Sequence, residues 1–256
     1  MIIYKDYDTT SLLFNEPCEI NGIGNVYPVL LKDYKKLRKY SHYLTFSKEY
    51  LGIGDDVGLL YALIIAFSQD KCRDAEKIDI AIMETLKEFA DLFSIITRKE
   101  IIYNEIDNDF VFKSIDGVVT INSENFDVLR NVVLKMCLIK ENKVFKNKEV
   151  EKWYYKGLKA AQRGKKEIDI DDVVSIVIQD MKYSFEYVYN LNIFQLYVLY
   201  ARINNSIGYE TISKFRCVGE VKSNLEFNDG VIASLYKDIE LGDLLMSKEE
   251  LAGMIS

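Results

Sequence analysis

The spacing of apolar residues predicts that most of this chain is helical. In several stretches large apolar side chains recur at steps of three and four residues, which places them on one face of a helix. The only two prolines lie within the first thirty residues, so no proline interrupts a helix further along. In the first part of the chain the predicted helices are 31–44, 59–67, 75–96 and 123–137.

Two shorter stretches predict strands. Residues 17–31 contain two extended runs around Asn21-Gly22, a turn signal, and residues 100–121 read as two or three strands joined by Asp and Asn turns. The expected fold class is mainly α with a minor β element (α+β), with a small N-terminal hairpin. We expect an N-terminal lobe, residues 1–140, and a helical C-terminal lobe, residues 141–256.

Polar residues are expected to begin several of these helices. Asp55 or Asp56 is placed to cap the helix that carries Leu59, and Ser123 with Glu124 opens the helix that follows the strands. In the C-terminal lobe the predicted helices are short: 184–189, 192–205, 209–217, 228–239 and 247–254.

The run YNLNIFQLYVLYARI, residues 189–203, is apolar nearly all round a helix. Phe194 lies on one stripe, and Tyr197 and Tyr200 lie on a neighbouring one. Such a helix is either central in its lobe, or covered partly by the lobe and partly by another chain. Both interpretations stay open, with the core favoured and the tyrosine hydroxyls suited to the rim of an interface.

The segment 140–166 is strongly basic in an acidic chain. It carries a net charge of +7, so the rest of the chain carries −14 to reach the formal −7. Lys152 and Lys156 lie on one predicted helix face beside Trp153, an arrangement that could bind nucleic acid by charge and stacking. Nine of the ten positive residues are lysine rather than arginine, which together with the acidic chain favours a solvated helix or an acidic protein partner.

No catalytic, cofactor-binding or metal-binding residues are expected. The single histidine, His42, has no ligand or triad partner at a suitable spacing. Gly22-Ile23-Gly24 lacks the rest of a phosphate-binding motif and predicts a hairpin turn. Asp169, Asp171 and Asp172 lack the pattern of a calcium loop and are expected to begin a helix.

The four cysteines are far apart, and the first residues show no basic and apolar leader pattern. The longest apolar block, residues 58–67, is shorter than the roughly 20 residues that a spanning helix needs. We therefore expect a cytoplasmic protein without disulfides or membrane segments.

Two stretches resemble proteins of tailed bacteriophages. INGIGNVYPVLLKDYKKLRKY, residues 20–40, resembles the start of tail-assembly and baseplate-hub accessory proteins, in which a strand pair runs into a helix. Residues 163–210 are similar to a segment of phage tail proteins, with Asn192 where threonine is usual and Phe194 where tyrosine is usual. Phage-tail-like bacteriocins share the same resemblance.

The resemblance implies a protein of the host cytoplasm during assembly, or a part of the virion or tail-like particle. Its implied partners are other tail or baseplate proteins, including the tape-measure protein, and it implies no cofactor and no enzymatic activity. We expect an assembly chaperone or minor structural subunit, and the alternative is a nucleic-acid-binding accessory protein that uses 140–166. The residues predicted to contact a partner are Phe194, Tyr197, Tyr200, Lys152, Trp153 and Lys156.

Overall fold

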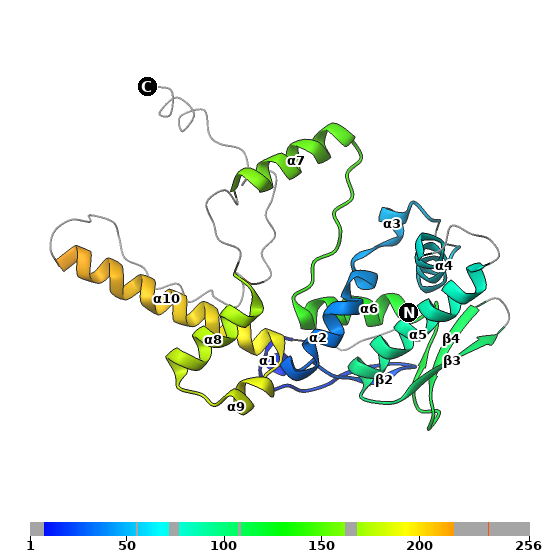
Figure 1. Ribbon diagram of the computed structural model, residues 1–256, viewed down its shortest axis with the longest axis horizontal. Coiled ribbons are helices and arrows are strands. Elements are labelled where there is room, and N and C mark those ends of the chain that lie inside the picture. The colour runs from blue at the N-terminus through cyan, green and yellow to red at the C-terminus, as the bar shows by residue number, and fades with distance from the viewer. Residues whose placement is uncertain are drawn as a thin grey trace.

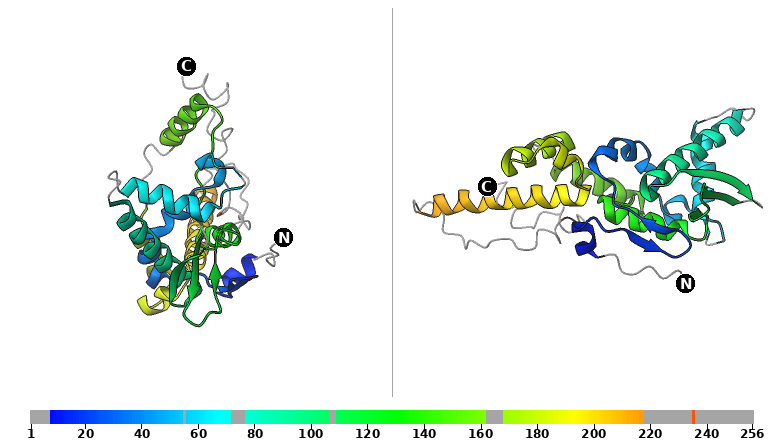
Figure 2. Two further views of the ribbon diagram at one scale, coloured as in Figure 1. Left: turned by 90° about the vertical axis from the view of Figure 1, so that its right-hand side faces the viewer. Right: turned by 90° about the horizontal axis from the view of Figure 1, so that it is seen from below.

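The protein is described by a computed structural model that covers residues 8–54, 56–71, 77–106, 109–161, 168–217 and 235 (Figure 1). Helices dominate, and two small antiparallel sheets accompany them, which confirms the predicted fold class. The molecule is elongated: the sheet that contains β3 (Ile101–Ile106) and β4 (Asp109–Ser114) lies at one end, and the helix α10 (Ile193–Cys217) extends toward the other (Figure 2).

The chain begins with a short helix and a hairpin. α1 (Thr9–Leu13) precedes β1 (Cys18–Ile20) and β2 (Gly24–Val26), which pair antiparallel as predicted. The φ angle is +81° at Gly22 and +89° at Gly24, a left-handed conformation that glycine adopts without steric cost. The two glycines therefore form the hairpin turn and no phosphate-binding loop.

Four helical elements follow. The predicted helix 31–44 ends early as an α-helix, because its last part tightens into a 3-10 turn that contains His42. These elements are α2 (Leu31–Tyr40), η1 (Ser41–Thr45), α3 (Lys48–Leu51) and α4 (Leu59–Lys71).

The structure places the starts of two helices differently from the prediction. α4 begins at Leu59, so Gly58 precedes it and Asp56 lies further back, while Asp55 is outside the described residues. A Cβ at Gly58 would lie 2.4 Å from that of Ser123, which explains a glycine here. α6 (Phe126–Cys137) begins later than predicted, with Asn125 at the N-cap position, and the side chain of Asn122 accepts the N–H groups of residues 124 and 125 just before it, at 3.1 and 3.2 Å.

The central part of the fold packs a long helix against a three-stranded sheet. The strand order is β3-β4-β5, all antiparallel, and α5 contacts β3, α2 and α4. The elements are α5 (Ile78–Thr97), β3 (Ile101–Ile106), β4 (Asp109–Ser114), β5 (Thr120–Ile121) and α6 (Phe126–Cys137).

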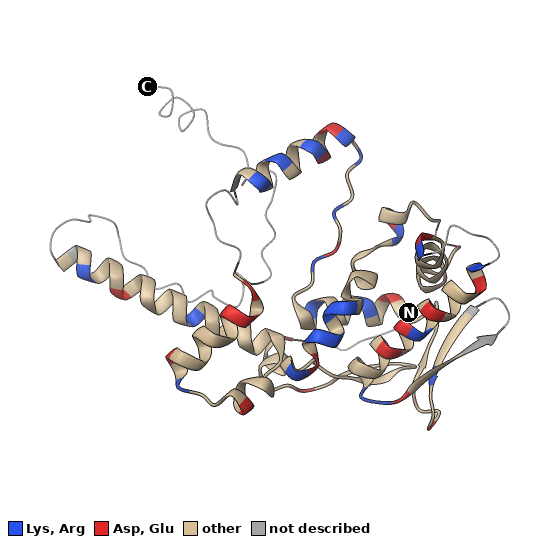
Figure 3. Ribbon diagram, in the orientation of Figure 1, with Lys and Arg blue, Asp and Glu red and all other residues tan. Residues whose placement is uncertain are grey.

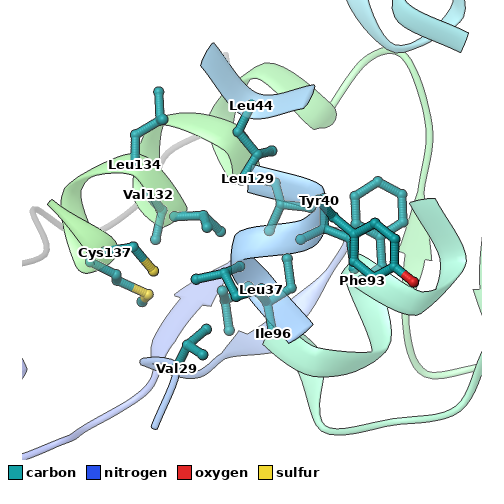
Figure 4. Packing of buried hydrophobic residues seen from close by; sticks show 14 of the residues in the cluster. Val29, Leu37, Tyr40, Leu44, Phe93, Ile96, Leu129, Val132, Leu134 and Cys137 are labelled. Carbon is teal, nitrogen blue, oxygen red and sulfur yellow. The ribbon is translucent and has the colours of Figure 1, made fainter. Parts of the chain in front are cut away.

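The main hydrophobic cluster lies between these elements and the hairpin. Phe93 of α5 meets Phe112 of β4 edge-on, with ring centroids 4.9 Å apart, and the two rings of Phe89 and Phe126 lie beside them. α2 and α6 pack on the same cluster through Leu37 and Leu129 (Figure 4). Burying each large apolar side chain stabilises the fold by roughly 1.5–3 kcal/mol.

The remaining elements are helices. The predicted break between 205 and 209 is absent, since one helix runs through both predicted pieces, and the predicted helix 247–254 lies outside the described residues, as does 228–239 apart from Leu235. The helices are α7 (Lys148–Ala161), α8 (Ile170–Met181), α9 (Phe185–Tyr189) and α10 (Ile193–Cys217). None of the helices among the described residues is long and apolar enough to cross a membrane.

Candidate protein-binding surface

The six residues predicted to contact a partner fall in two separate places. Three of them, Lys152, Trp153 and Lys156, lie on α7, which stands out from the rest of the molecule as a basic helix (Figure 3). The other three, Phe194, Tyr197 and Tyr200, lie on the first half of α10.

The segment before α7 is fastened to the body of the protein. α6 ends at Leu138, whose φ of +54° reverses the chain. The buried side chain of Arg130 donates from Nε to the carbonyl of Leu44, at 2.7 Å, and forms an ion pair with Glu141. The backbone N–H of Asn142 donates to the carbonyl of Thr45, at 2.8 Å. These contacts fix the start of the linker that leads to α7.

Local sequence explains why α7 forms. The side chain of Asn147, immediately before the helix, accepts from the N–H of Glu149 at 2.8 Å, as an N-cap residue does. Glu149 and Glu151 lie in the first turn and Lys159 lies in the last, which suits the helix dipole.

Two faces of α7 differ sharply in exposure. On the inner face Tyr154 is only 8% exposed, and its ring lies 5.1 Å from the ring of Phe145 between centroids. On the outer face Trp153 is 68% exposed, and the ammonium of Lys156 lies 5.5 Å from its ring centroid. The lysines share one exposed stripe: Lys148, Lys152, Lys156 and Lys159.

A groove runs between the inner face of α7 and the end of α6. Its volume is about 720 Å³. Leu134 and Leu138 line it from the side of α6, Tyr154 and Leu158 line it from α7, and Leu235 also lines it. The groove is partly apolar, with Lys135, Lys140 and Lys143 on its walls.

The start of α10 is a polar junction rather than a binding surface. Asn192 and Gln195 form a reciprocal capping box, because each side chain accepts the backbone N–H of the other residue, at 2.9 and 2.8 Å. Their side-chain amides also donate to the carbonyls of Leu12 and Leu13, at 2.8 and 2.7 Å. The same two side chains therefore begin α10 through their oxygens and hold α1 against it through their amide nitrogens.

The structure assigns the first half of α10 largely to the core. Phe194 has no exposed surface, so it packs internally and presents nothing to a partner here. Tyr197 and Tyr200 are half-buried against the core, and burial raises the pKa of Tyr197 above its ordinary value. Tyr197 also lines a hollow with Tyr34, at the junction of α2 and α8.

The acids at 169–172 have the predicted role at a helix start. The side chain of Asp169 accepts from the N–H of Ile170 at 2.7 Å, and Asp171 and Asp172 lie in the first turn of α8. Asp169 also lies 3.7 Å from the guanidinium of Arg38 on α2, which links two parts of the chain. Within the described residues no cluster of three or more His, Cys, Asp or Glu side chains could hold a metal ion.

The sequence interpretation missed one polar cluster. The hydroxyl of Tyr43 and the ammonium of Lys71 both donate to the carboxylate of Glu88. Burial alone would raise the pKa of Glu88, but these two donors outweigh it and lower the pKa below its ordinary value. The rings of His42 and Tyr43 are tilted against each other with centroids 4.0 Å apart, and burial lowers the pKa of His42. Residues from three distant elements meet here, and no local spacing in the sequence signals it.

Comparison with known proteins finds two similarities. Residues 162–229 match a protein family described as "YomV second domain". The chain is 27% identical, over 221 residues, to a protein named "SPbeta prophage-derived uncharacterized protein YomV" from Bacillus subtilis (strain 168), and the match covers 84% of this chain and 85% of that protein. No solved structure matches. The chain is thus similar over most of its length to a protein encoded by a prophage.

Proposed function

We propose that this protein acts in the assembly of a phage tail or baseplate, as an assembly chaperone or minor structural subunit. Its partner is another tail or baseplate protein with an acidic surface, the tape-measure protein among the candidates. The protein acts by binding and not by catalysis. The outer face of α7, formed by Lys152, Trp153 and Lys156, is the contact surface.

The observation that carries this proposal is the exposed Trp153 on the outer face of α7, a helix that also has a buried residue, Tyr154, on its inner face. Trp153 keeps 68% of its surface exposed, although tryptophan is among the residues that contribute most to binding when a partner covers them. A basic stripe lies beside it, which suits an acidic partner. Tyr154, on the inner face of the same helix, is buried beside Phe145, which leaves Trp153 on the exposed side of the helix. The similarity to a prophage-encoded protein supports a phage partner.

The test is recovery of partners during phage growth. An affinity-tagged full-length chain is produced in the host while the phage that encodes it multiplies, and proteins that co-purify are identified by mass spectrometry. We expect a tail, baseplate or tape-measure protein. In the triple variant Lys152→Glu, Trp153→Ala, Lys156→Glu its recovery should fall at least about tenfold, as for loss of a binding hot spot.

A matched control carries equivalent changes on exposed residues elsewhere: Lys36→Glu, Phe185→Ala and Lys214→Glu. The control should recover the partner normally. Equal recovery by the α7 variant would remove α7 as the contact surface. Recovery of replication proteins in place of tail proteins would contradict the assembly role itself.

A second candidate function is nucleic-acid binding, which the exposed stripe of lysines beside Trp153 also favours. It is tested with single- and double-stranded DNA and RNA at two salt concentrations. Binding that weakens steeply with salt and disappears in the α7 variant would support this candidate over an acidic protein partner.

A further inference from the structure

We infer that the groove between α6 and α7 is the docking site of the chain's own C-terminal segment, with Leu235 as its anchor. This contact fastens α7 to the body of the protein. It does not require any partner on the outer face of α7, so it stands apart from the function proposed above.

Leu235 is one of the residues that connect the main hydrophobic cluster with the surroundings of α7, since Leu134 of that cluster lines the same groove. Tyr154 is buried on α7, but it does not belong to the main hydrophobic cluster. Leu235 is half-buried, packs against that main cluster, and lines the groove together with Tyr154 and Leu158. One leucine from the C-terminal part of the chain therefore contacts both the core and the surroundings of α7.

The sequence around Leu235 suits an apolar groove. Ile232, Leu235 and Ile239 recur at steps of three and four residues, the spacing of one helix face. The groove of about 720 Å³ has room for more than one such side chain. A segment with a single apolar stripe gains from burying it, at roughly 1.5–3 kcal/mol for each large side chain.

Charge favours the same occupant. Residues 236–256 contain five acidic residues and two lysines, whereas residues 140–166 carry a net +7. Three lysines, at 135, 140 and 143, line the groove itself together with two glutamates, Glu49 and Glu141, so basic residues outnumber acidic ones on its walls. The acidic segment that follows Leu235 is thus complementary in charge to the basic walls of the groove. This complementarity favours binding of that segment over binding of a basic segment.

The experiment measures hydrogen exchange of the full-length chain with Leu235→Asp. A carboxylate in the apolar contact should release α7, so amides of residues 148–161 should exchange at least tenfold faster while those of α5 stay unchanged. Trp153 is the only tryptophan, so a fall in its fluorescence anisotropy reports the same release. The control Leu251→Asp makes the same change elsewhere in the C-terminal segment and should leave α7 unaffected.

Three results would overturn the inference. The first is unchanged exchange of α7 in Leu235→Asp. The second is protection of α7 that depends on protein concentration, which would place a second copy in the groove. If α5 also loses protection in Leu235→Asp, the smaller change Leu235→Ala is measured instead. Faster exchange confined to α7 in Leu235→Ala supports the docking. Faster exchange throughout the protein, or no change, is the third result that overturns it.

Discussion

At the scale of single residues, Asn192 connects more of the fold than any sequence pattern indicated. Its side chain caps α10 through the N–H of Gln195 and donates to the carbonyl of Leu12 on α1. In the sequence it stood out only because the phage tail segment that this stretch resembles usually has threonine there. Threonine can cap a helix but offers no amide to donate, so the link to α1 depends on asparagine.

Replacing Asn192 should therefore be costly. Asn192→Ala removes the cap and leaves a buried carbonyl without its donor, so we expect the free energy of unfolding to fall by about 2–3 kcal/mol. Asn192→Asp keeps an acceptor for the cap but loses the donor, and should also destabilise. The measurement is urea denaturation followed by circular dichroism. Asn204→Ala, at an exposed position of the same helix, is the control and should change stability by less than about 0.5 kcal/mol.

The cluster around Glu88 gives a pH prediction. Its pKa in the folded protein lies below the ordinary value of 4.5. A lowered pKa in the folded state means that the unfolded chain takes up the proton first, so this contribution to stability is present above pH 4.5 and is lost as the pH falls through the folded pKa. Wild-type protein should lose stability over this range more steeply than Glu88→Gln. Equal pH dependence of the two proteins would show that Lys71 and Tyr43 do not stabilise the carboxylate.

At the scale of elements, periodicity predicted the helices well and their ends poorly. The stripes that begin at Ile78 and at Phe126 correspond to α5 and α6, and the runs at 100–121 to three strands. The ends depend on contacts that are remote in sequence. Gly58, for example, precedes α4 because Ser123 packs against it, and nothing near Gly58 in the sequence reveals that neighbour.

Gly208 lies inside α10, at the break that the sequence predicted between two helices. Glycine in a helix interior costs up to about 1 kcal/mol relative to alanine. In the structure a Cβ added there meets nothing within 4 Å.

Gly208→Ala should therefore stabilise the second half of α10 by about 0.5–1 kcal/mol, seen as slower hydrogen exchange of residues 204–217. Gly22→Ala is the opposite case, since its φ of +81° is strained for alanine and the change should destabilise the protein by about 1–2 kcal/mol. Faster exchange in Gly208→Ala would mean that the glycine serves a contact beyond this chain.

At the scale of the whole molecule, the hydrophobic cluster crosses the predicted boundary near residue 140. It includes Phe93 and Leu129 from one side and Val177 and Phe194 from the other. Two lobes stay a prediction, but they share this cluster. The sequence indicates which residues are apolar enough for a core, and it does not indicate that two stretches bury them against each other. For the same reason the sequence left the tyrosines of 189–203 open between core and interface, with the core favoured.

A shared cluster has a measurable consequence. We expect one cooperative unfolding transition, with α5 and α8 losing protection from hydrogen exchange at the same denaturant concentration. The measurement is exchange across a urea series, compared with circular dichroism on the same samples. Loss of α8 to α10 at clearly lower urea than α5 would contradict this expectation and favour two independently stable lobes.

The length of α10 gives the molecule a mechanical property. At a rise of about 1.5 Å per residue its 25 residues span about 37 Å. The first half is held by the Asn192 and Gln195 junction and by α8, whereas none of the described side chains from Asn204 onward is buried. The helix is therefore a lever that turns about its buried first half. A force applied near Phe215 turns into torque on α1 and α8, so whatever pulls on the far end of α10 strains the core first at Asn192.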